Sequence, residues 1–105
     1  MKIKGKTKDW EVIYCKNFLS RLKGNMGKKE IDNVLQFPKC NSIHTFFMRS
    51  AIDVVMISES GIVLHCFPKV SKWRIIWPRK NVYAILEFPP GENQYHIGEQ
   101  IEYKK

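Results

Sequence analysis

Three polar side chains interrupt an apolar block in the middle of this chain, between residues 43 and 58. They are His44, Arg49 and Asp53, which together offer a group that exchanges a proton near neutral pH, a permanent cation and a carboxylate. Burying such groups without partners costs several kcal/mol. We therefore expect each of them to have a dedicated partner, either within the fold or in a bound ligand.

A second carboxylate, Glu87, lies inside another apolar run. One interpretation is structural: arginines pair with Glu87 and Asp53 through two parallel hydrogen bonds and so fix the register of the strands. Under this interpretation Arg21 or Arg49 should lie within hydrogen-bonding reach of one of the two carboxylates. Arg74 is the third candidate partner.

The other interpretation is functional. His44 would act with Asp53 or Glu87 as general acid and base, or would help to bind a polar ligand, in a small cleft. Because His44 follows a loop at residues 38–42, it should lie at the edge of the polar set and face a groove. The two interpretations remain open at this point, and the catalytic candidates are His44, Asp53 and Glu87.

Aromatic and basic side chains stand side by side between residues 73 and 80, at Trp73-Arg74, Trp77 and Arg79-Lys80. A flat ring beside a cation suits a nucleic-acid base with its phosphate, or a sugar. The alternative is that Trp73 covers the core and Arg74 pairs with an acid. The ligand-binding candidates of the whole chain are His44, Arg49, Trp73 and Arg74.

The spacing of cysteines and histidines does not predict a metal site. Cys40 and His44 are four residues apart, and the adjacent His65 and Cys66 would point to opposite faces of a strand. A nucleophile and base made of Cys40 and His44 would lack an identifiable orienting residue. Three cysteines without a C-x-x-C pair indicate reduced thiols and a cytoplasmic protein. We predict no metal ion and no cofactor.

The net charge of +8 is high for a chain of 105 residues. Residues 1–9 form a basic N-terminal arm, and in an extended arm its alternating lysines would share one side: Lys2, Lys4, Lys6 and Lys8. The arm is either a solvated, frayed terminus or a handle for weak nucleic-acid binding. No RNP-type, zinc-finger or helix-turn-helix pattern supports the second option. No apolar run reaches the roughly 18–20 residues of a membrane span.

The pattern predicts a single α+β domain, mainly β, over residues 10–105. Asn17, followed by apolar residues at spacings of three and four, indicates one short helix near residues 17–24. The turn Glu59-Ser60-Gly61 indicates a hairpin between two β-branched runs. Because the run from Ile52 is apolar on both faces, we expect a small, half-closed, barrel-like antiparallel or mixed sheet. The expected strands are 10–15, 34–37, 52–58, 62–67, 73–77, 82–88 and 100–103.

Several segments resemble one family. Residues 21–28 (RLKGNMGK) resemble the R-x-x-G-L-M-G-R opening of the family called domain of unknown function 192, and residues 44–55 (HTFFMRSAIDVV) look like its central H-T-F-F-M-R-x-x-I-D-V-V block. Its W-R, L-E-x-P-x-G and I-x-x-G-D elements are similar to residues 73–74, 86–91 and 97–99. The resemblance covers residues 10–103 and is that of a divergent member, which departs at Asn25, Lys28, Ala51 and Glu99. It implies a small β-rich domain and no established activity or cofactor.

We therefore expect a non-catalytic binding or accessory module that presents a small polar cleft to a small polar ligand or a protein partner. A small enzyme that uses His44 with Asp53 or Glu87 is one alternative. Nucleic-acid binding through the basic surface is another. A pocket that holds His44 beside an unpaired carboxylate would favour an enzyme or a ligand binder, whereas a core with every charge paired would favour a scaffold.

Overall fold

The computed structural model describes residues 1–15, 32–45 and 50–104, and for His44 the backbone alone. These residues form nine strands, and none of them lies in a helix. The helix expected near residues 17–24 lies outside the described residues. Across the described ranges there is no helix of the length and apolarity needed to cross a membrane. The protein is mainly β.

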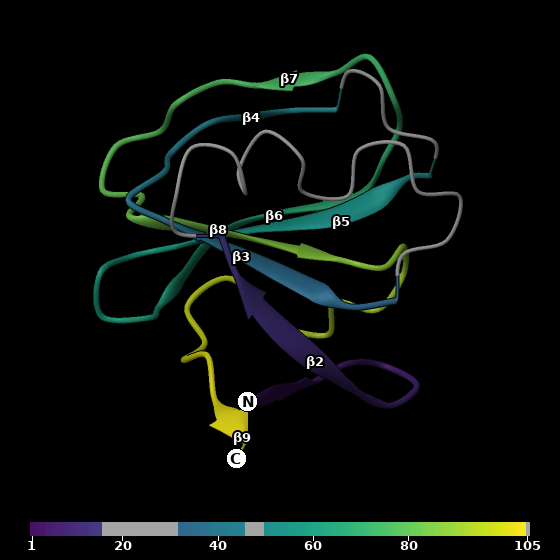
Figure 1. Cartoon of the computed structure of the whole chain (residues 1–105). Coiled ribbons are helices and arrows are strands. Elements are labelled where there is room, and N and C mark those ends of the chain that lie inside the picture. Colours follow the sequence, from purple (N-terminus) through teal and green to yellow (C-terminus); the bar gives the residue numbers. More distant parts are fainter. Residues whose placement is uncertain (16–31, 46–49, 105) are drawn as a thin grey trace.

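Seven strands form one sheet and two form a small second sheet (Figure 1). They are β1 (Lys2–Lys4), β2 (Asp9–Tyr14), β3 (Val34–Pro38), β4 (Ile43–His44), β5 (Ile52–Ile57), β6 (Val63–Val70), β7 (Ile75–Ile76), β8 (Ala84–Phe88) and β9 (Tyr103–Lys104). In the described part of the chain the large sheet has the order β6-β5-β8-β3-β2-β1-β9, and β4 pairs with β7. β2 and β3 run parallel and the other pairs run antiparallel, so the sheet is mixed.

The hairpin predicted between residues 52–58 and 62–67 is confirmed, because β5 and β6 pair antiparallel. Gly61 takes a φ of 85° in the turn, a left-handed conformation that glycine adopts without steric strain. The Ser58 amide donates to the carbonyl of Ile62 over 2.9 Å, and the Ile62 amide donates to the Ser58 hydroxyl over 3.1 Å. The turn residues therefore fix the register of the two central strands.

Both faces of the large sheet are apolar, as the six consecutive buried residues of β5 require. On one face Ile52, Val54 and Met56 pack with Ile85 of β8 and with Ile76 of β7. The β4–β7 pair therefore covers this face, and Figure 1 shows it lying above β5. The opposite face carries the larger cluster, made up of Ile3, Val12, Val34, Val55, Ile57, Val63, Ala84, Leu86, Phe88 and Ile101.

The described sheet is open, because its end strands β6 and β9 do not pair with each other. The segment just before β9 nevertheless reaches the start of β6. The Val63 amide donates to the Glu99 carbonyl over 2.8 Å, the Gly98 amide donates to the Val63 carbonyl over 2.8 Å, and the Ile101 amide donates to the Gly61 carbonyl over 2.9 Å. The half-closed barrel expected from the sequence is thus replaced by an open sheet whose ends are tied by a loop.

The N-terminus is a sheet strand and not a frayed arm. β1 pairs with β2 on one side and with β9 on the other, and the Ile3 side chain is fully buried. Lys2 and Lys4 flank Ile3 and are exposed. Lys2 and Lys4 therefore belong to an amphipathic strand, because Ile3 between them faces the core.

Glu92 fastens the connection from β1 to β2. Its Oε1 accepts hydrogen bonds from the Thr7 amide at 2.9 Å and from the Trp10 indole at 2.8 Å, while its carbonyl accepts one from the Lys6 amide. Burial raises the pKa of the Glu92 carboxyl, but the hydrogen bonds from Thr7, Trp10 and Lys6 outweigh burial and hold that pKa below its usual value. The ionised form therefore stabilises the fold.

This arrangement predicts a pH dependence. Because the pKa of Glu92 is lower in the folded chain, its stabilising contribution is present above the unfolded pKa, about 4.3, and is lost as the pH falls through the folded pKa. Glu92→Gln should lower the melting temperature at pH about 7 and should flatten its fall between about pH 5 and pH 2. Thermal melts of both proteins over this range measure the difference. If the melting temperatures of the two proteins fell equally between these pH values, the ionised Glu92 carboxylate would not stabilise the fold.

Candidate functional site

Asp53 is held by backbone amides and is almost fully buried, with 3% of its surface exposed. Its Oδ1 accepts hydrogen bonds from the amides of Lys69 at 2.8 Å and Gly91 at 3.0 Å, and its Oδ2 accepts one from the Asn93 amide at 3.0 Å. Three such donors satisfy a carboxylate without a cation. The described partners of Asp53 are therefore main-chain groups from β6 and the 89–93 turn.

The expected partners Arg21 and Arg49 lie outside the described residues. Arg74 is described and exposed, and its Nε donates to the Ser71 hydroxyl over 3.4 Å. Glu87 is buried, with 4% of its surface exposed. The expectation that Arg21 or Arg49 pairs with a carboxylate stays a prediction.

The two buried carboxylates lie on opposite faces of the sheet. Asp53 alternates with Val54 along β5 and stands opposite Phe88, whereas Glu87 stands opposite Val54. Val54 belongs to the face that β4 and β7 cover, and Phe88 belongs to the other. The backbone of His44 in β4 is on the side of Glu87, so the two carboxylate candidates Asp53 and Glu87 do not face the same site.

Thr45 joins β4 to the segment that leads into β7. Its hydroxyl donates to the Ser71 carbonyl at 2.7 Å and accepts from the Arg74 amide at 2.8 Å. Its amide donates to the Arg74 carbonyl at 2.8 Å, and the Trp73 amide donates to its carbonyl at 3.2 Å. Thr45 is buried, with 1% of its surface exposed, so these bonds fix the loop from inside.

Residues 71–80, here called the β7 ribbon, are all exposed except Ile76. The exposed fractions are 59% for Trp73, 44% for Ile75 and 68% for Trp77. Trp73 therefore does not cover the core, which corrects the alternative considered from the sequence. The strand expected over residues 73–77 is reduced to Ile75–Ile76, because the Trp73 backbone has a φ of 64°.

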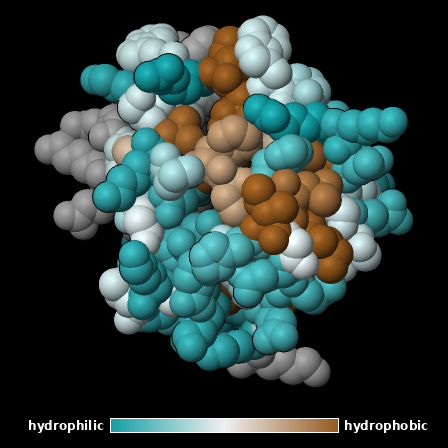
Figure 2. Space-filling view, turned by 180° about the vertical axis from the view of Figure 1, so that it is seen from behind, coloured by the Kyte–Doolittle hydropathy of each residue, from teal (hydrophilic) through white to brown (hydrophobic). Residues whose placement is uncertain are grey.

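A groove of about 360 Å³ runs beside the ribbon, and we call it the β7 groove. Its lining comes from the end of β6 and from the ribbon: Phe67, Pro68, Lys69, Val70, Ser71, Arg74, Ile75, Ile76, Trp77 and Arg79. The Arg79 guanidinium lies over the Phe67 ring at 5.0 Å. None of these described residues carries a negative charge. The groove is thus cationic and aromatic, and Figure 2 shows apolar side chains gathered among hydrophilic ones on the face seen from behind.

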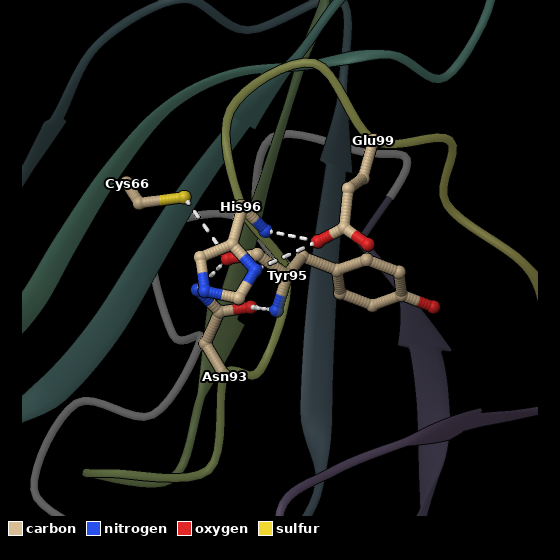
Figure 3. A network of polar contacts seen from close by, with 5 residues as sticks. All are labelled: Cys66, Asn93, Tyr95, His96 and Glu99. Carbon is tan, nitrogen blue, oxygen red and sulfur yellow. Dashed lines mark hydrogen bonds and ion pairs between the residues drawn. The ribbon is translucent and has the colours of Figure 1, made fainter.

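A second polar cluster lies between β6 and the 93–99 loop (Figure 3). The Cys66 thiol donates to the Tyr95 carbonyl at 3.6 Å, and Asn93 bonds the Tyr95 backbone through both ends of its amide. His96 donates its amide to Glu99 and places Nδ1 3.1 Å from the same carboxylate oxygen. These contacts close the loop upon itself and attach it to the sheet.

The chemistry of this cluster is structural. Burial, together with the negative charges of Asp53 and Glu99, raises the pKa of the Cys66 thiol against a smaller opposing effect of Asn93. A protonated thiol is a poor nucleophile and a poor metal ligand. The amide and ring of His96 lower the pKa of the Glu99 carboxyl. Among the described residues, no three His, Cys, Asp or Glu side chains come together as a metal site would require.

The sequence identified the groove residues only in part. Arg74, Trp77 and Arg79 were identified as part of a run of aromatic residues beside cations and line the groove, whereas Trp73 belongs to the ribbon but not to the described lining. Phe67 and Lys69 were missed, because nothing in the order of residues shows that the end of β6 lies against β7. Arg49 and the His44 side chain lie outside what the structure describes.

The fold and site together define a small mainly-β domain with a surface groove. The chain matches the family model described as an uncharacterised conserved family, domain of unknown function 192, over residues 1–102. It belongs to this family, as the motifs at residues 44–55 and 86–91 predicted.

Relatives carry the family name UPF0127 protein. The one from Thermococcus kodakarensis is 37% identical over 94 residues, which cover 84% of this chain and 59% of that protein, so the chain spans little more than half of it. The one from Pyrococcus furiosus is 31% identical over 97% of this chain and 94% of its own length.

Two solved structures share the fold. One is a protein of unknown function from Novosphingobium aromaticivorans, with a TM-score of 0.74, 12% identity and coverage of 97% of this chain and 82% of that one. The other comes from Sinorhizobium meliloti, with a TM-score of 0.73, 15% identity and coverage of 97% and 90%. These likenesses establish the architecture.

Proposed function

We propose that this domain is a non-catalytic binding module whose ligand site is the β7 groove. The observation that carries the proposal is the lining of the groove, which combines three cations with exposed and half-buried aromatic rings and contains no described acid. A ligand that fits this lining has a negative charge and a flat apolar part. The groove volume of about 360 Å³ falls in the range of small-ligand sites.

The two parts of the lining have distinct roles. The cations Lys69, Arg74 and Arg79 attract an anion, and a guanidinium can bind a carboxylate or phosphate through two parallel hydrogen bonds. Trp77 and Phe67 offer ring faces to a flat group. Because Arg79 already lies over Phe67, its guanidinium is partly oriented before a ligand arrives. Such orientation lowers the entropy lost on binding.

The hydrogen bonds of Asp53 favour this proposal over an enzyme. A general base must accept a proton from a substrate, but both oxygens of Asp53 already accept bonds from backbone amides. Glu87 lies on the face that β4 and β7 cover, opposite to that of Asp53, and is not among the described residues that line the groove. His44 with Asp53 would have to act across the sheet.

A fluorescent anion tests the proposal. Anilinonaphthalene sulfonate combines an anionic group with a flat aromatic system, and its emission rises when it leaves water. Arg79→Ala and Trp77→Ala should each weaken its binding by about tenfold, the equivalent of one charged hydrogen bond or one ring contact. Fluorescence titration at fixed protein concentration measures the dissociation constant.

Two exposed residues outside the groove provide matched controls. Lys4→Ala removes an exposed cation from β1, and Ile97→Ala removes a side chain whose exposed fraction, 68%, equals that of Trp77. Both controls should bind the probe as the unmodified chain does. The site would be refuted if Lys4→Ala weakened probe binding as much as Arg79→Ala, or Ile97→Ala as much as Trp77→Ala, while the melting temperatures of the variants stayed unchanged.

A further inference from the structure

We infer that the β7 groove and the β7 ribbon bind single-stranded nucleic acid, with bases on the exposed tryptophans and phosphates on the neighbouring cations. This inference rests on the proposed function and names the ligand class of the same site. It is carried by charge, by the placement of the aromatic rings and by the backbone conformation at Trp73.

The charge of the segment has one sign. Between Pro68 and Asn81 the chain carries five cations and no acid: Lys69, Lys72, Arg74, Arg79 and Lys80. Apart from Ile76, every residue of the ribbon is exposed, so the four cations within the ribbon face solvent. Exposed cations without neighbouring acids in the segment attract a phosphate backbone.

The rings stand among these cations. Trp73, Ile75 and Trp77 occupy alternate positions of the ribbon and are its most apolar exposed side chains. Four residues of chain separate the two tryptophans by at most about 13 Å, which leaves room for a nucleotide between two stacked bases. Every base offers a flat face, so this arrangement binds without requiring a particular sequence.

The backbone holds Trp73 outward against its own preference. A φ of 64° is unusual for a residue with a bulky side chain and is strained, because the side chain crowds the backbone in this region. The hydrogen bonds of Thr45 to Ser71, Trp73 and Arg74 maintain this conformation. The Trp73 side chain is 59% exposed, so this conformation keeps much of the ring at the surface of the ribbon.

The shape of the site favours a nucleic acid over a membrane surface. Exposed tryptophans beside lysines and arginines also occur where proteins contact anionic bilayers. A bilayer requires only apolar side chains that protrude, whereas here two rings, Phe67 and Trp77, line a groove and Arg79 lies over the Phe67 ring. A concave site with rings inside it suits a base.

The N-terminal lysines are a second possible binding site for nucleic acid on the same protein. Lys2 and Lys4 are exposed on β1, which is separated from β6 by β5, β8, β3 and β2. Removing residues 1–8 would also remove β1 with the buried Ile3, so a truncation would damage the fold. Replacing the lysines by glutamine keeps the strand and tests the charges alone.

Fluorescence anisotropy of a labelled oligothymidylate of about 12 nucleotides, at about 50 mM salt, tests the inference on the full chain. Trp77→Ala should weaken binding by at least about fivefold, and Trp77→Phe should restore most of it because a ring face remains. Arg79→Ala should reduce the slope of log affinity against log salt by about 0.7, the value for one phosphate contact on a single strand. Ile97→Ala should bind as the unmodified chain does.

Four results would overturn the inference. The first is that the oligonucleotide does not bind at low salt, and the second is that Ile97→Ala weakens binding as much as Trp77→Ala does. The third is that replacing Lys2, Lys4, Lys6 and Lys8 by glutamine abolishes binding while Trp77→Ala binds normally. The fourth is that the protein binds phosphatidylserine vesicles but not the oligonucleotide. Retained binding of anilinonaphthalene sulfonate in the β7 groove together with any of these results would leave the proposed function in place and remove this inference. The two claims therefore fail separately.

Discussion

Replacing Asp53 by alanine is expected to lower the free energy of unfolding by about 3–5 kcal/mol, because three amides lose a charged acceptor at once. Those amides belong to Lys69, Gly91 and Asn93, which lie 16, 38 and 40 residues away from Asp53 in the chain. The carboxylate therefore attaches the end of β6 and the 89–93 turn to β5. Urea denaturation followed by circular dichroism measures the loss.

The amide variant makes the prediction sharper. An asparagine side chain at this position would keep one oxygen for two of the donors but would set an NH₂ group against the third. Asp53→Asn should therefore cost less than Asp53→Ala and more than zero. Asp9→Ala is the matched control, because Asp9 pairs with Lys104 on the surface at 3.1 Å and should cost at most about 1 kcal/mol. A loss at position 53 no larger than that at position 9 would contradict the structural role of Asp53.

Replacing Thr45 by valine should destabilise the protein by about 1–3 kcal/mol and should also weaken binding in the β7 groove. Valine has nearly the same shape but removes the hydroxyl that donates to the Ser71 carbonyl and accepts from the Arg74 amide. Because these bonds hold Trp73 at a φ of 64°, their loss lets the ribbon relax to a conformation in which the rings and cations no longer line one groove.

Thr45→Ser separates the hydroxyl from the rest of the side chain. Serine keeps the hydrogen bonds and loses one methyl group, so it should restore affinity for anilinonaphthalene sulfonate even where it does not restore full stability. Parallel denaturation and titration of both variants provide the measurement. If valine and serine weakened binding to the same extent, the hydroxyl would have no role in positioning the ribbon.

The sequence predicted the central strands well because their signals are local. The β-branched runs on either side of Glu59-Ser60-Gly61 form the β5–β6 hairpin, and the apolar run in β8 forms a buried strand. The six buried residues of β5 confirm that both faces are covered. Each of these features is decided by residues within a few positions of one another.

Features that depend on distant segments were missed or only partly predicted. Residues Lys2–Lys4 place lysines at alternate positions, as a solvated arm would. One side of β1 is nevertheless buried, because β1 pairs with β2 and with β9. The main-chain partners of Asp53 could not be predicted, because the amide of Asn93 comes from a turn 40 residues away in the chain. The sequence alone does not show which loop will place its backbone amides against a buried carboxylate.

In the candidate site, too, local features could be predicted from the sequence and tertiary contacts could not. Trp73, Trp77 and the nearby cations carry a local signal that the sequence shows directly, and both tryptophans are exposed in the structure. The groove itself depends on β6 ending beside β7 and on Thr45 tying β4 to the ribbon, both of which are tertiary contacts. The pairing of β4 with β7 places the His44 backbone opposite Ile75, next to the ribbon.

The most direct measurement of the central claim is a map of amide chemical shifts during titration of the isotopically labelled protein with anilinonaphthalene sulfonate. We expect the largest shifts between Phe67 and Arg79, and we expect Arg79→Ala to reduce them while Lys4→Ala leaves them unchanged. Shifts centred on the Cys66, His96 and Glu99 cluster, or spread evenly over both faces of the sheet, would contradict a ligand site in the β7 groove.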